Sequence, residues 1–408
     1  MVNMTHVPTA GTFSKDKRFY GDLFPFDYVT EGSGAFVKGN NGKTYLDWVC
    51  GLGASILGYG NVDRNAFYHY MRMMLERGNG FSFPHSLEYT AAEKLANLLN
   101  KNIPVWNKVH LQVRWFKTGS AACDGAVRMA RAITGKKKIL SSGYHGYHDN
   151  FVSLTKPAHG VLSGVSRYME DIPFNDISVF NGKKDVAAVI IEHPLTDPDE
   201  NYYAYVRKWC DDNGALFIMD EVVTGLRFGP GGVCGRFDIH PDMICMGKAL
   251  GNGMPIAAIV APMEYMDEWF TRNDPVFISS TNHGDVIGLA AAEYVIDRIS
   301  STPTYHDYLV KIGHSLMTGL KDIGYNVIGH PERSLVVFDN EYEHAAFIHQ
   351  MANAGIIMNR PNFGTLSHLP TNVRDTLSNA EYVYGWIKTN DIKKIYADHL
   401  PYRLFTNR

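Results

Sequence analysis

Short apolar segments alternate with segments of helical periodicity along most of the chain. Apolar and polar positions repeat with helical spacing over residues 62–77 and 86–100. After them come six short segments rich in apolar residues, at 113–118, 137–143, 186–192, 215–221, 243–247 and 255–261. Strands that are apolar on both faces and separated by helices predict a mainly parallel sheet covered on both sides. We therefore expect a three-layer α/β/α domain.

The two ends of the chain follow a different pattern. Residues 1 to about 30 are polar and aromatic without a clear period, which is typical of an arm. Apolar and polar residues then alternate around Asn41-Gly42, a dipeptide that strongly predicts a hairpin. A helix predicted over 288–299 is followed by a break rich in Ser and Thr with one Pro, and then by helices mixed with short strands. We expect an arm and small antiparallel unit at 1–60, a large domain at 61–295 and a smaller α+β C-terminal domain at 296–408.

The amino-acid composition indicates which kinds of binding partner to expect. The chain has 408 residues, 45% of them hydrophobic and 20% charged, and a net charge of −3. Because Lys and Arg are scattered, the sequence predicts small-molecule substrates and no nucleic acid. The five cysteines are spread without a CxxC pair, which favours neither a disulfide framework nor a metal site. No segment approaches the roughly 18 apolar residues of a membrane span, and the N-terminus lacks an apolar core. We expect a cytoplasmic protein without membrane contact.

Two ends of apolar strands carry the residues with the most specific chemistry. Apolar residues run into Asp220, and Lys248 follows another apolar strand and precedes a glycine-rich turn. Burial disfavours an ionised carboxylate unless a cation meets it, and it lowers the pKa of a lysine. An unprotonated lysine can form a Schiff base with an aldehyde, and a buried aspartate can keep a pyridine nitrogen protonated. These are the two groups that pyridoxal phosphate requires. The alternatives are a loop-capping aspartate and a surface lysine.

Other polar residues follow predicted strands, where ligands bind at the carboxyl edge of a parallel sheet. Gly119 and Ser120 begin a predicted helix, whose N-terminal amides either bind a phosphate or are simply capped. Tyr144 and His145 follow the next strand, where an aromatic ring can stack on a flat cofactor.

Three further positions also have a functional interpretation. Val222, two residues after Asp220, would cover one face of a stacked ring. Glu192 ends a strand, where it either accepts hydrogen bonds from loop amides or approaches the substrate. Thr281 precedes another predicted helix and is either part of a second phosphate-binding set or an N-cap.

Together these segments resemble the class III, fold type I pyridoxal phosphate enzymes, in particular the glutamate-1-semialdehyde 2,1-aminomutase branch. The resemblance covers nearly the whole chain and includes, in order, GKTYLDWVCGLGASILGYG, TGSAACDGAVRMARAITG, GYHGYHD, IIEHP, DEVVTGLRFGPGG, GKALGNGMP and NRPNFGTLSHLPTNVRDT. Agreement in order and spacing over so many segments is far more specific than any single motif. It implies the fold type I architecture, pyridoxal 5'-phosphate as cofactor, and an obligate homodimer with active sites at the subunit interface.

The resemblance also implies roles for particular residues. Lys248 would be the Schiff-base lysine and Asp220 the partner of the pyridine nitrogen. Val222 and Tyr144 would enclose the ring. The remaining expected cofactor contacts, mainly to the phosphate, are Gly119, Ser120, His145 and, from the neighbouring subunit, Thr281.

The sequence departs from the family pattern at two positions around the cofactor, and a third departure, the motif NHGD at 282–285, lies at the expected substrate entrance. Family members usually have an acidic residue in place of Ala121 and Pro in place of His193. The expected substrate residues are Glu192, Arg18 and Arg360. We expect an aminotransferase that moves an amino group between a small amine or amino acid and a carbonyl compound. The alternatives are an aminomutase, which moves the group within one molecule, and a decarboxylase or lyase on the same scaffold.

Overall fold

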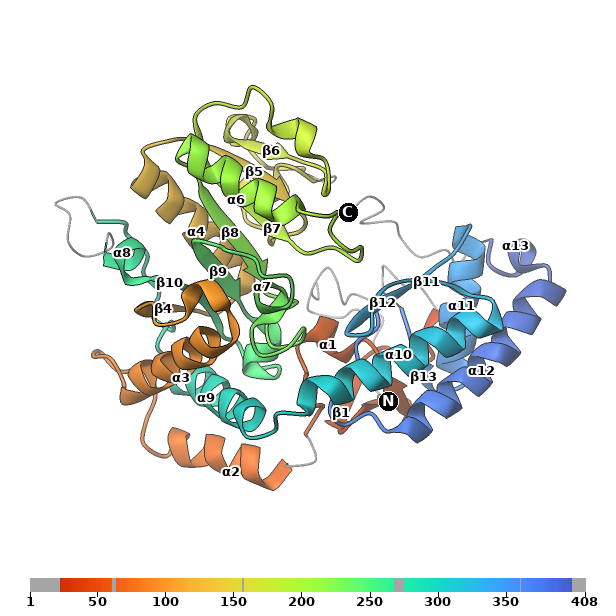
Figure 1. Ribbon diagram of the computed structural model, residues 1–408. Helices are drawn as coiled ribbons and strands as arrows, with labels where there is room; N and C mark the ends of the chain where they lie inside the picture. Colours follow the sequence, from red (N-terminus) through yellow and green to blue (C-terminus); the bar gives the residue numbers. More distant parts are fainter. Residues whose placement is uncertain (1–22, 61–63, 156–157, 268–274, 360, 398–408) are drawn as a thin grey trace.

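A seven-stranded sheet forms the centre of the larger lobe (Figure 1). The structure is a computed structural model that describes residues 23–60, 64–155, 158–267, 275–359 and 361–397. The sheet has the order β4-β10-β9-β8-β7-β5-β6. Its strands are β4 (Leu111–Phe116), β5 (Lys138–Ser142), β6 (Met169–Asp171), β7 (Val186–Glu192), β8 (Leu216–Glu221), β9 (Met243–Met246) and β10 (Ala257–Pro262).

Most neighbouring strands of this sheet are parallel. The pairs from β6 to β9 run parallel, whereas β10 is antiparallel to both β4 and β9. The predicted mainly parallel sheet is therefore confirmed. The reversed direction of β10 and the short edge strand β6 were not evident from the apolar pattern.

Helices cover both faces of the sheet, which makes three layers. Successive residues of a strand point to opposite faces, so in β7 Ile190 packs in one core and Val189 in the other. The Ile190 side is covered by α4 (Gly119–Thr134). The Val189 side is covered by α3 (Ser86–Asn102), α6 (Tyr202–Asn213) and α9 (Val286–Ser300), with α2 (Arg64–Leu75) outside α9. The shorter helices of this lobe are α5 (Asp149–Val152), α7 (Gly232–Arg236) and α8 (Met263–Met266).

The smaller lobe combines both ends of the described chain. A four-stranded sheet has the order β1 (Val29–Ser33), β2 (Phe36–Gly39), β3 (Thr44–Asp47) and β13 (Ile356–Ile357). The antiparallel pairing of β2 with β3 confirms the predicted hairpin. Trp48 packs in one core with Leu316 and Val383, so the N-terminal strands share their core with the C-terminal helices. The other elements of this lobe are α1 (Cys50–Gly53), α10 (Tyr305–Ile323), the hairpin of β11 (Asn326–His330) and β12 (Arg333–Val337), α11 (Glu341–Asn353), α12 (Pro370–Thr389) and α13 (Ile392–Ile395).

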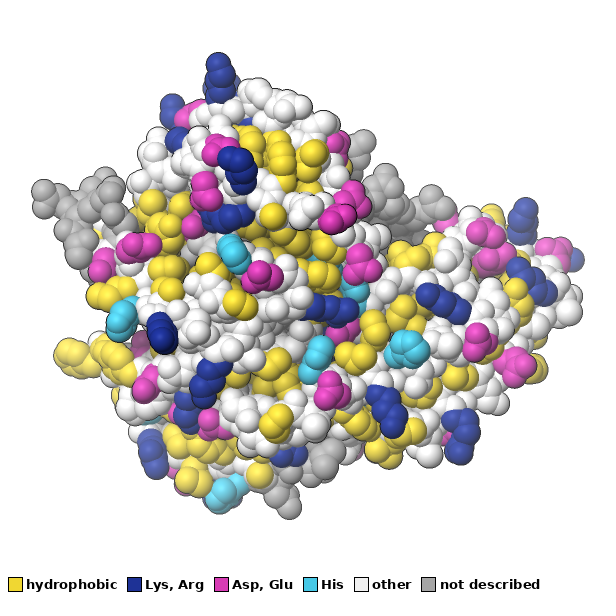
Figure 2. Space-filling model, viewed as in Figure 1, with side chains coloured by type: hydrophobic (Ala, Val, Ile, Leu, Met, Phe, Trp, Pro, Cys, Tyr) yellow, Lys and Arg dark blue, Asp and Glu magenta, His cyan; other side chains and the backbone are white. Residues whose placement is uncertain are grey.

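The two lobes meet at the carboxyl edge of the large sheet. The run from α9 to α10 passes from one lobe to the other (Figure 1). Arg333 of β12 forms an ion pair with Glu192 at the end of β7, so the β11–β12 hairpin of the small lobe lies against this edge. Basic and acidic side chains are interspersed over the face in Figure 2. Among the described helices, none combines the length and the apolar composition that spanning a bilayer requires.

Candidate active site

Lys248 lies two residues after the end of β9 in an unusual backbone conformation. Its φ of 45° is in the left-handed region, which is strained for a residue with a side chain and persists only when surrounding contacts hold it. Burial lowers the pKa of Lys248; Glu192 raises it and Arg333 lowers it. Within the described ranges the amine of Lys248 has no hydrogen-bond or ion-pair partner. The site therefore contains an amine that loses its proton more readily than an exposed lysine.

The adjacent carboxylates of Asp220 and Glu221 have different surroundings because successive strand residues point to opposite faces. Glu221 faces α7, where its oxygens accept hydrogen bonds from the backbone N–H groups of Val233 and Cys234 and from the hydroxyl of Thr224. Burial raises the pKa of Glu221, and these hydrogen bonds oppose that shift. Glu221 thus serves the local fold, which leaves Asp220 as the carboxylate of the site.

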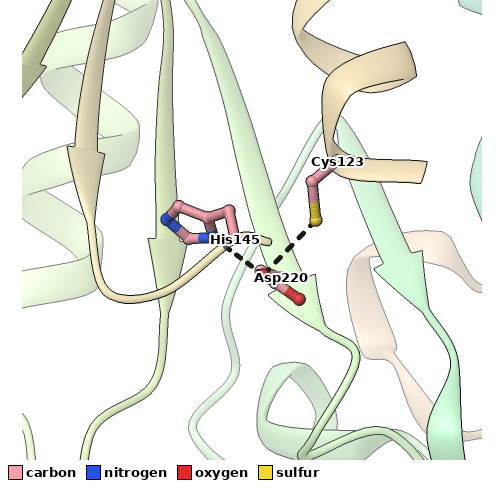
Figure 3. Close-up of side chains that lie close together, drawn as sticks. All are labelled: Cys123, His145 and Asp220. Atoms are coloured by element: carbon pink, nitrogen blue, oxygen red, sulfur yellow. Dashed lines mark hydrogen bonds and ion pairs between the residues drawn. The ribbon is translucent and has the colours of Figure 1, made fainter. Parts of the chain in front are cut away.

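Asp220 is held by donors from two other elements (Figure 3). Its Oδ2 lies 2.7 Å from Nδ1 of His145 and accepts a hydrogen bond of 3.3 Å from the thiol of Cys123, in α4. Its Oδ1 accepts a hydrogen bond of 2.9 Å from the backbone N–H of Val222. Burial lowers the pKa of His145, but the hydrogen bonds to Asp220 and Cys123 outweigh it and raise that pKa to about 10. His145 therefore keeps its proton and contacts Asp220 as a buried cation.

The same three side chains have the composition of a metal site. One atom each of Cys123, His145 and Asp220 lies within 4.8 Å of the others. Metal binding requires a thiolate and a neutral imidazole. Here burial raises the pKa of the Cys123 thiol, and His145 is protonated. These protonation states favour a hydrogen-bonded triad over a metal centre.

The start of α4 lies against the end of β8. Thr118 caps the helix by accepting a hydrogen bond of 3.1 Å from the N–H of Ala121. A methyl group on Gly119 would lie 2.5 Å from Cγ1 of Val222, so only glycine allows this approach. Gly146, in the loop after β5, likewise leaves space for the side chain of Ser120. Gly119, Ser120 and Val222 are thereby brought together at a helix N-terminus, which can bind a phosphate.

Glu192 joins three elements at the same edge. Its Oε2 accepts a hydrogen bond of 3.0 Å from the backbone N–H of Tyr144, and its Oε1 lies 3.0 Å from Nη1 of Arg333. Tyr144 is 44% exposed; burial and then the charge of Glu192 raise the pKa of its hydroxyl. Both interpretations of Glu192 are compatible with this geometry, because it accepts from a loop amide and also faces the site of Lys248.

Arg227 links three segments of the chain by hydrogen bonds from its side chain. Its guanidinium donates hydrogen bonds to the carbonyl oxygens of Gly53 (2.8 Å) and Gly364 (2.7 Å), and it lies over the ring of Phe363. Burial lowers its pKa to about 10. Since Gly53 and Gly364 come from opposite ends of the chain, Arg227 ties both to the loop after β8.

Not every expected site residue can be placed. Thr281 lies in an exposed turn before α9. Arg18 and Arg360 lie outside the described residues. Conversely, sequence reasoning missed Arg333 and Cys123 as neighbours of the site. Arg333 had no local signal because its partner is 141 positions away, whereas Cys123, one helical turn after Gly119, could have been placed near the strand ends.

Comparisons with known proteins agree with this geometry. The family model described as Aminotransferase class-III matches residues 22–373. The chain is 30% identical over 337 residues to the glutamate-1-semialdehyde 2,1-aminomutase of Natronomonas pharaonis, which covers 76% of this chain and 73% of that protein. It is 31% identical over 326 residues to the enzyme of the same name from Francisella philomiragia, with 74% and 71% covered.

Solved structures show the same fold. A structure described as a transaminase with PLP bound has a TM-score of 0.81 at 21% identity and covers 91% of this chain and 93% of its own. An omega-transaminase from Sphaerobacter thermophilus has a TM-score of 0.80 at 22% identity, with 93% and 94% covered.

Proposed function

This chain belongs to the class-III aminotransferase family, and from that premise we propose which of its residues carry the transfer of an amino group. The enzyme is a pyridoxal 5'-phosphate-dependent aminotransferase of fold type I. The sequence resemblance to this family is thereby confirmed.

The described residues fit the cofactor. Lys248 offers a partly buried amine that has no partner among the described residues, and Asp220 offers a buried carboxylate in contact with a protonated histidine. Because Gly119 has no side chain, the N-terminus of α4 can lie close to Val222, at the same edge of the sheet. When bound, pyridoxal phosphate supplies an aldehyde for the lysine and a ring that withdraws electrons from the bond to be broken.

Each residue then has a distinct task. Asp220, oriented by its contact with His145, would hold the pyridine nitrogen in its protonated form. The amides at Gly119 and Ser120 would bind the phosphate, and Tyr144 and Val222 would enclose the ring. Lys248, whose pKa burial lowers, would bind the cofactor and afterwards move a proton at the substrate carbon.

The observation that carries this proposal is the placement of Lys248 and Asp220 at the ends of the adjacent parallel strands β9 and β8. Replacing Lys248 by Ala should abolish the Schiff-base absorbance that pyridoxal phosphate adds to the protein, and it should abolish turnover. Lys208→Ala is the matched control, because Lys208 is exposed on α6 and pairs with Asp212. A Lys248→Ala protein with full turnover would refute the proposal.

The relatives' names favour one second function, which is an aminomutase. Both reactions use the same residues. In a transaminase the amino group stays on the cofactor after the first product departs, whereas in an aminomutase it returns to the same molecule. A screen of amino donors and carbonyl acceptors, with the cofactor spectrum followed in single turnovers, distinguishes them. A transaminase accumulates aminated cofactor when given a donor alone. An aminomutase converts one substrate completely without a second compound.

We also propose that the enzyme is a homodimer in which Thr281 of one subunit binds the phosphate of the other. Large exposed apolar side chains support an interface, with Phe83 at 82% and Phe277 at 79% exposure. If Thr281 acts across the interface, mixing inactive Lys248→Ala subunits with weakened Thr281→Ala subunits should restore one complete site per mixed dimer. Light scattering gives the mass, and no gain of activity on mixing would contradict a role across the interface.

The substrate residues and the location of the protein stay proposals. Glu192 is supported by its position beside Lys248, and Arg18 and Arg360 are candidate carboxylate ligands. Arg18→Met and Arg360→Met, each made separately, should raise KM for carboxylate-bearing substrates more than for simple amines. The five free, buried cysteines suit a reducing cytoplasm, which cell fractionation can test.

A further inference from the structure

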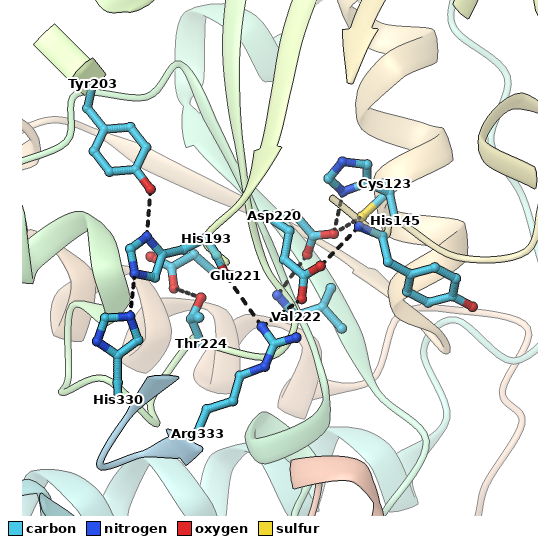
Figure 4. Close-up of polar contacts among 12 residues, drawn as sticks. Cys123, His145, His193, Tyr203, Asp220, Glu221, Val222, Thr224, His330 and Arg333 are labelled. Carbon is cyan, nitrogen blue, oxygen red and sulfur yellow. Dashed lines mark hydrogen bonds and ion pairs between the residues drawn. The ribbon is translucent and has the colours of Figure 1, made fainter. Parts of the chain in front are cut away.

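Two buried histidines join the large lobe to the small one beside the active site. His193 follows Glu192 directly, and its Nε2 lies 3.1 Å from Nε2 of His330, at the end of β11 (Figure 4). Its Nδ1 lies 2.7 Å from the hydroxyl of Tyr203, on α6. Both imidazoles are buried. This direct contact between two histidine rings is not used by the mechanism above.

The surrounding groups determine which nitrogen carries a proton. Burial raises the pKa of Tyr203, so its hydroxyl stays protonated and can donate to Nδ1 of His193. The N–H of His193 Nε2 then donates to His330, whose own proton is on Nδ1, 3.8 Å from a carboxylate oxygen of Asp197. The opposite arrangement would direct a lone pair of His330 at that carboxylate. A neutral pair therefore makes a consistent chain of hydrogen bonds from Tyr203 to His330, whose remaining N–H points toward Asp197.

The surroundings of both rings favour the neutral form. Burial lowers the pKa of His193 to about 3, and the nearby positive charges act in the same direction. Burial also lowers the pKa of His330. The charged or titratable groups that face the two rings are Tyr203 on α6, Arg236 on α7, Asp197 in the loop after β7, and Glu332 and Arg333 in the β11–β12 hairpin.

The same hairpin carries Arg333 to the active site. Nη1 of Arg333 is 3.0 Å from Oε1 of Glu192 and donates a hydrogen bond of 3.3 Å to the carbonyl oxygen of His193. His330 and Arg333 thus contact two consecutive residues at the end of β7. We propose that His193 and His330 form a clasp between the lobes that positions Arg333 against Glu192 at the Lys248 end of the sheet. This inference rests on the proposed function, because the position of Arg333 matters only if Lys248 is the reacting amine.

The clasp affects the reaction through charge. Glu192 and Arg333 are the charged groups that act most strongly on Lys248, and they act in opposite directions. When Arg333 is held beside Glu192, its positive charge offsets the carboxylate. If the hairpin is released, Glu192 remains near Lys248 without that compensation, and the amine holds its proton more tightly.

The test compares variants of His330 in the holoenzyme. His330→Ala should raise the pKa at which the Lys248 Schiff base titrates by about one pH unit. Arg333→Met should produce a similar rise, and the double variant should show no further rise because both changes remove the same contact. His330→Gln retains an acceptor for His193 and should titrate like the wild type. His349→Ala is the matched control, because His349 is also hydrogen-bonded to a tyrosine, Tyr396, but lies on α11 away from Glu192.

Two results would overturn the clasp. One is a titration in His330→Ala that equals the wild type while Arg333→Met shifts it, and the other is additive shifts in the double variant. A wild-type protein that forms no Schiff base with pyridoxal phosphate would instead refute the proposed function. In that case competitive acetylation, followed by mass spectrometry of the Lys248 peptide, measures the pKa of the amine directly. An unchanged value in His330→Ala would then refute the positioning role.

Discussion

The buried ion pair between His145 and Asp220 makes a quantitative prediction about stability. The pKa of His145 is raised from 6.5 to about 10, and the residue is only 2% exposed. At about 1.4 kcal/mol per pH unit, this displacement bounds the contribution of the protonated ring at about 5 kcal/mol. Breaking a buried pair by removing one partner costs about 3–5 kcal/mol. We therefore expect His145→Phe to lower the free energy of unfolding by about 3–5 kcal/mol near pH 6.

The pH dependence follows from the sign of the shift. A pKa that is higher in the folded protein means that the folded state binds the proton more tightly. The stabilisation is complete below the unfolded value of 6.5 and is lost as the pH rises through about 10. The difference in stability between the wild type and His145→Phe should therefore be largest at pH 6 and should shrink steadily toward pH 10.

Urea unfolding of the cofactor-free protein at several pH values measures this difference. His145→Asn is the matched variant, because an amide can still donate a hydrogen bond to Asp220 but carries no charge. Compared with His145→Phe, the Asn variant should regain part of the lost stability at high pH. At low pH it should regain little of the extra stability that the protonated ring gives the wild type. A gap between the wild type and His145→Phe that stays constant from pH 6 to pH 10 would refute the assignment of a protonated ring.

Three further predictions concern the packing of the site. Gly119→Ala should destabilise the fold by about 1–3 kcal/mol through its clash with Val222, and Val222→Ala in the same chain should recover most of that loss in thermal unfolding. Arg227→Met should cost about 3 kcal/mol or more, because two buried carbonyl groups lose their donor; a loss below about 1 kcal/mol in urea unfolding would argue against the bridge. Cys123→Ala should weaken pyridoxal phosphate binding measured by fluorescence, while Cys123→Ser, which keeps a donor for the carboxylate, should weaken it less and Cys210→Ser, on α6, should leave it unchanged.

The sequence was sufficient for features that depend on neighbouring residues. Apolar strands, the Asn41-Gly42 hairpin and the helix starting at Gly119 follow from local periodicity and from turn and capping preferences. The parallel strands then imply that their carboxyl ends meet at one edge, because parallel neighbours run in the same direction. For that reason the sequence alone predicts that Asp220 and Lys248 lie close together.

Only the tertiary structure decided which distant segments meet at that edge. Arg333 reaches Glu192 across 141 positions, and His330 reaches His193 across 137. Neither pair has a local pattern, because a salt bridge or a buried hydrogen bond leaves no periodicity in the sequence. The direction of β10 and the pairing of β3 with β13 were likewise undetermined, since an apolar strand fits either orientation until its neighbours are in place. Local sequence thus specified the reacting groups, and the packing of the two lobes determined the charges around them.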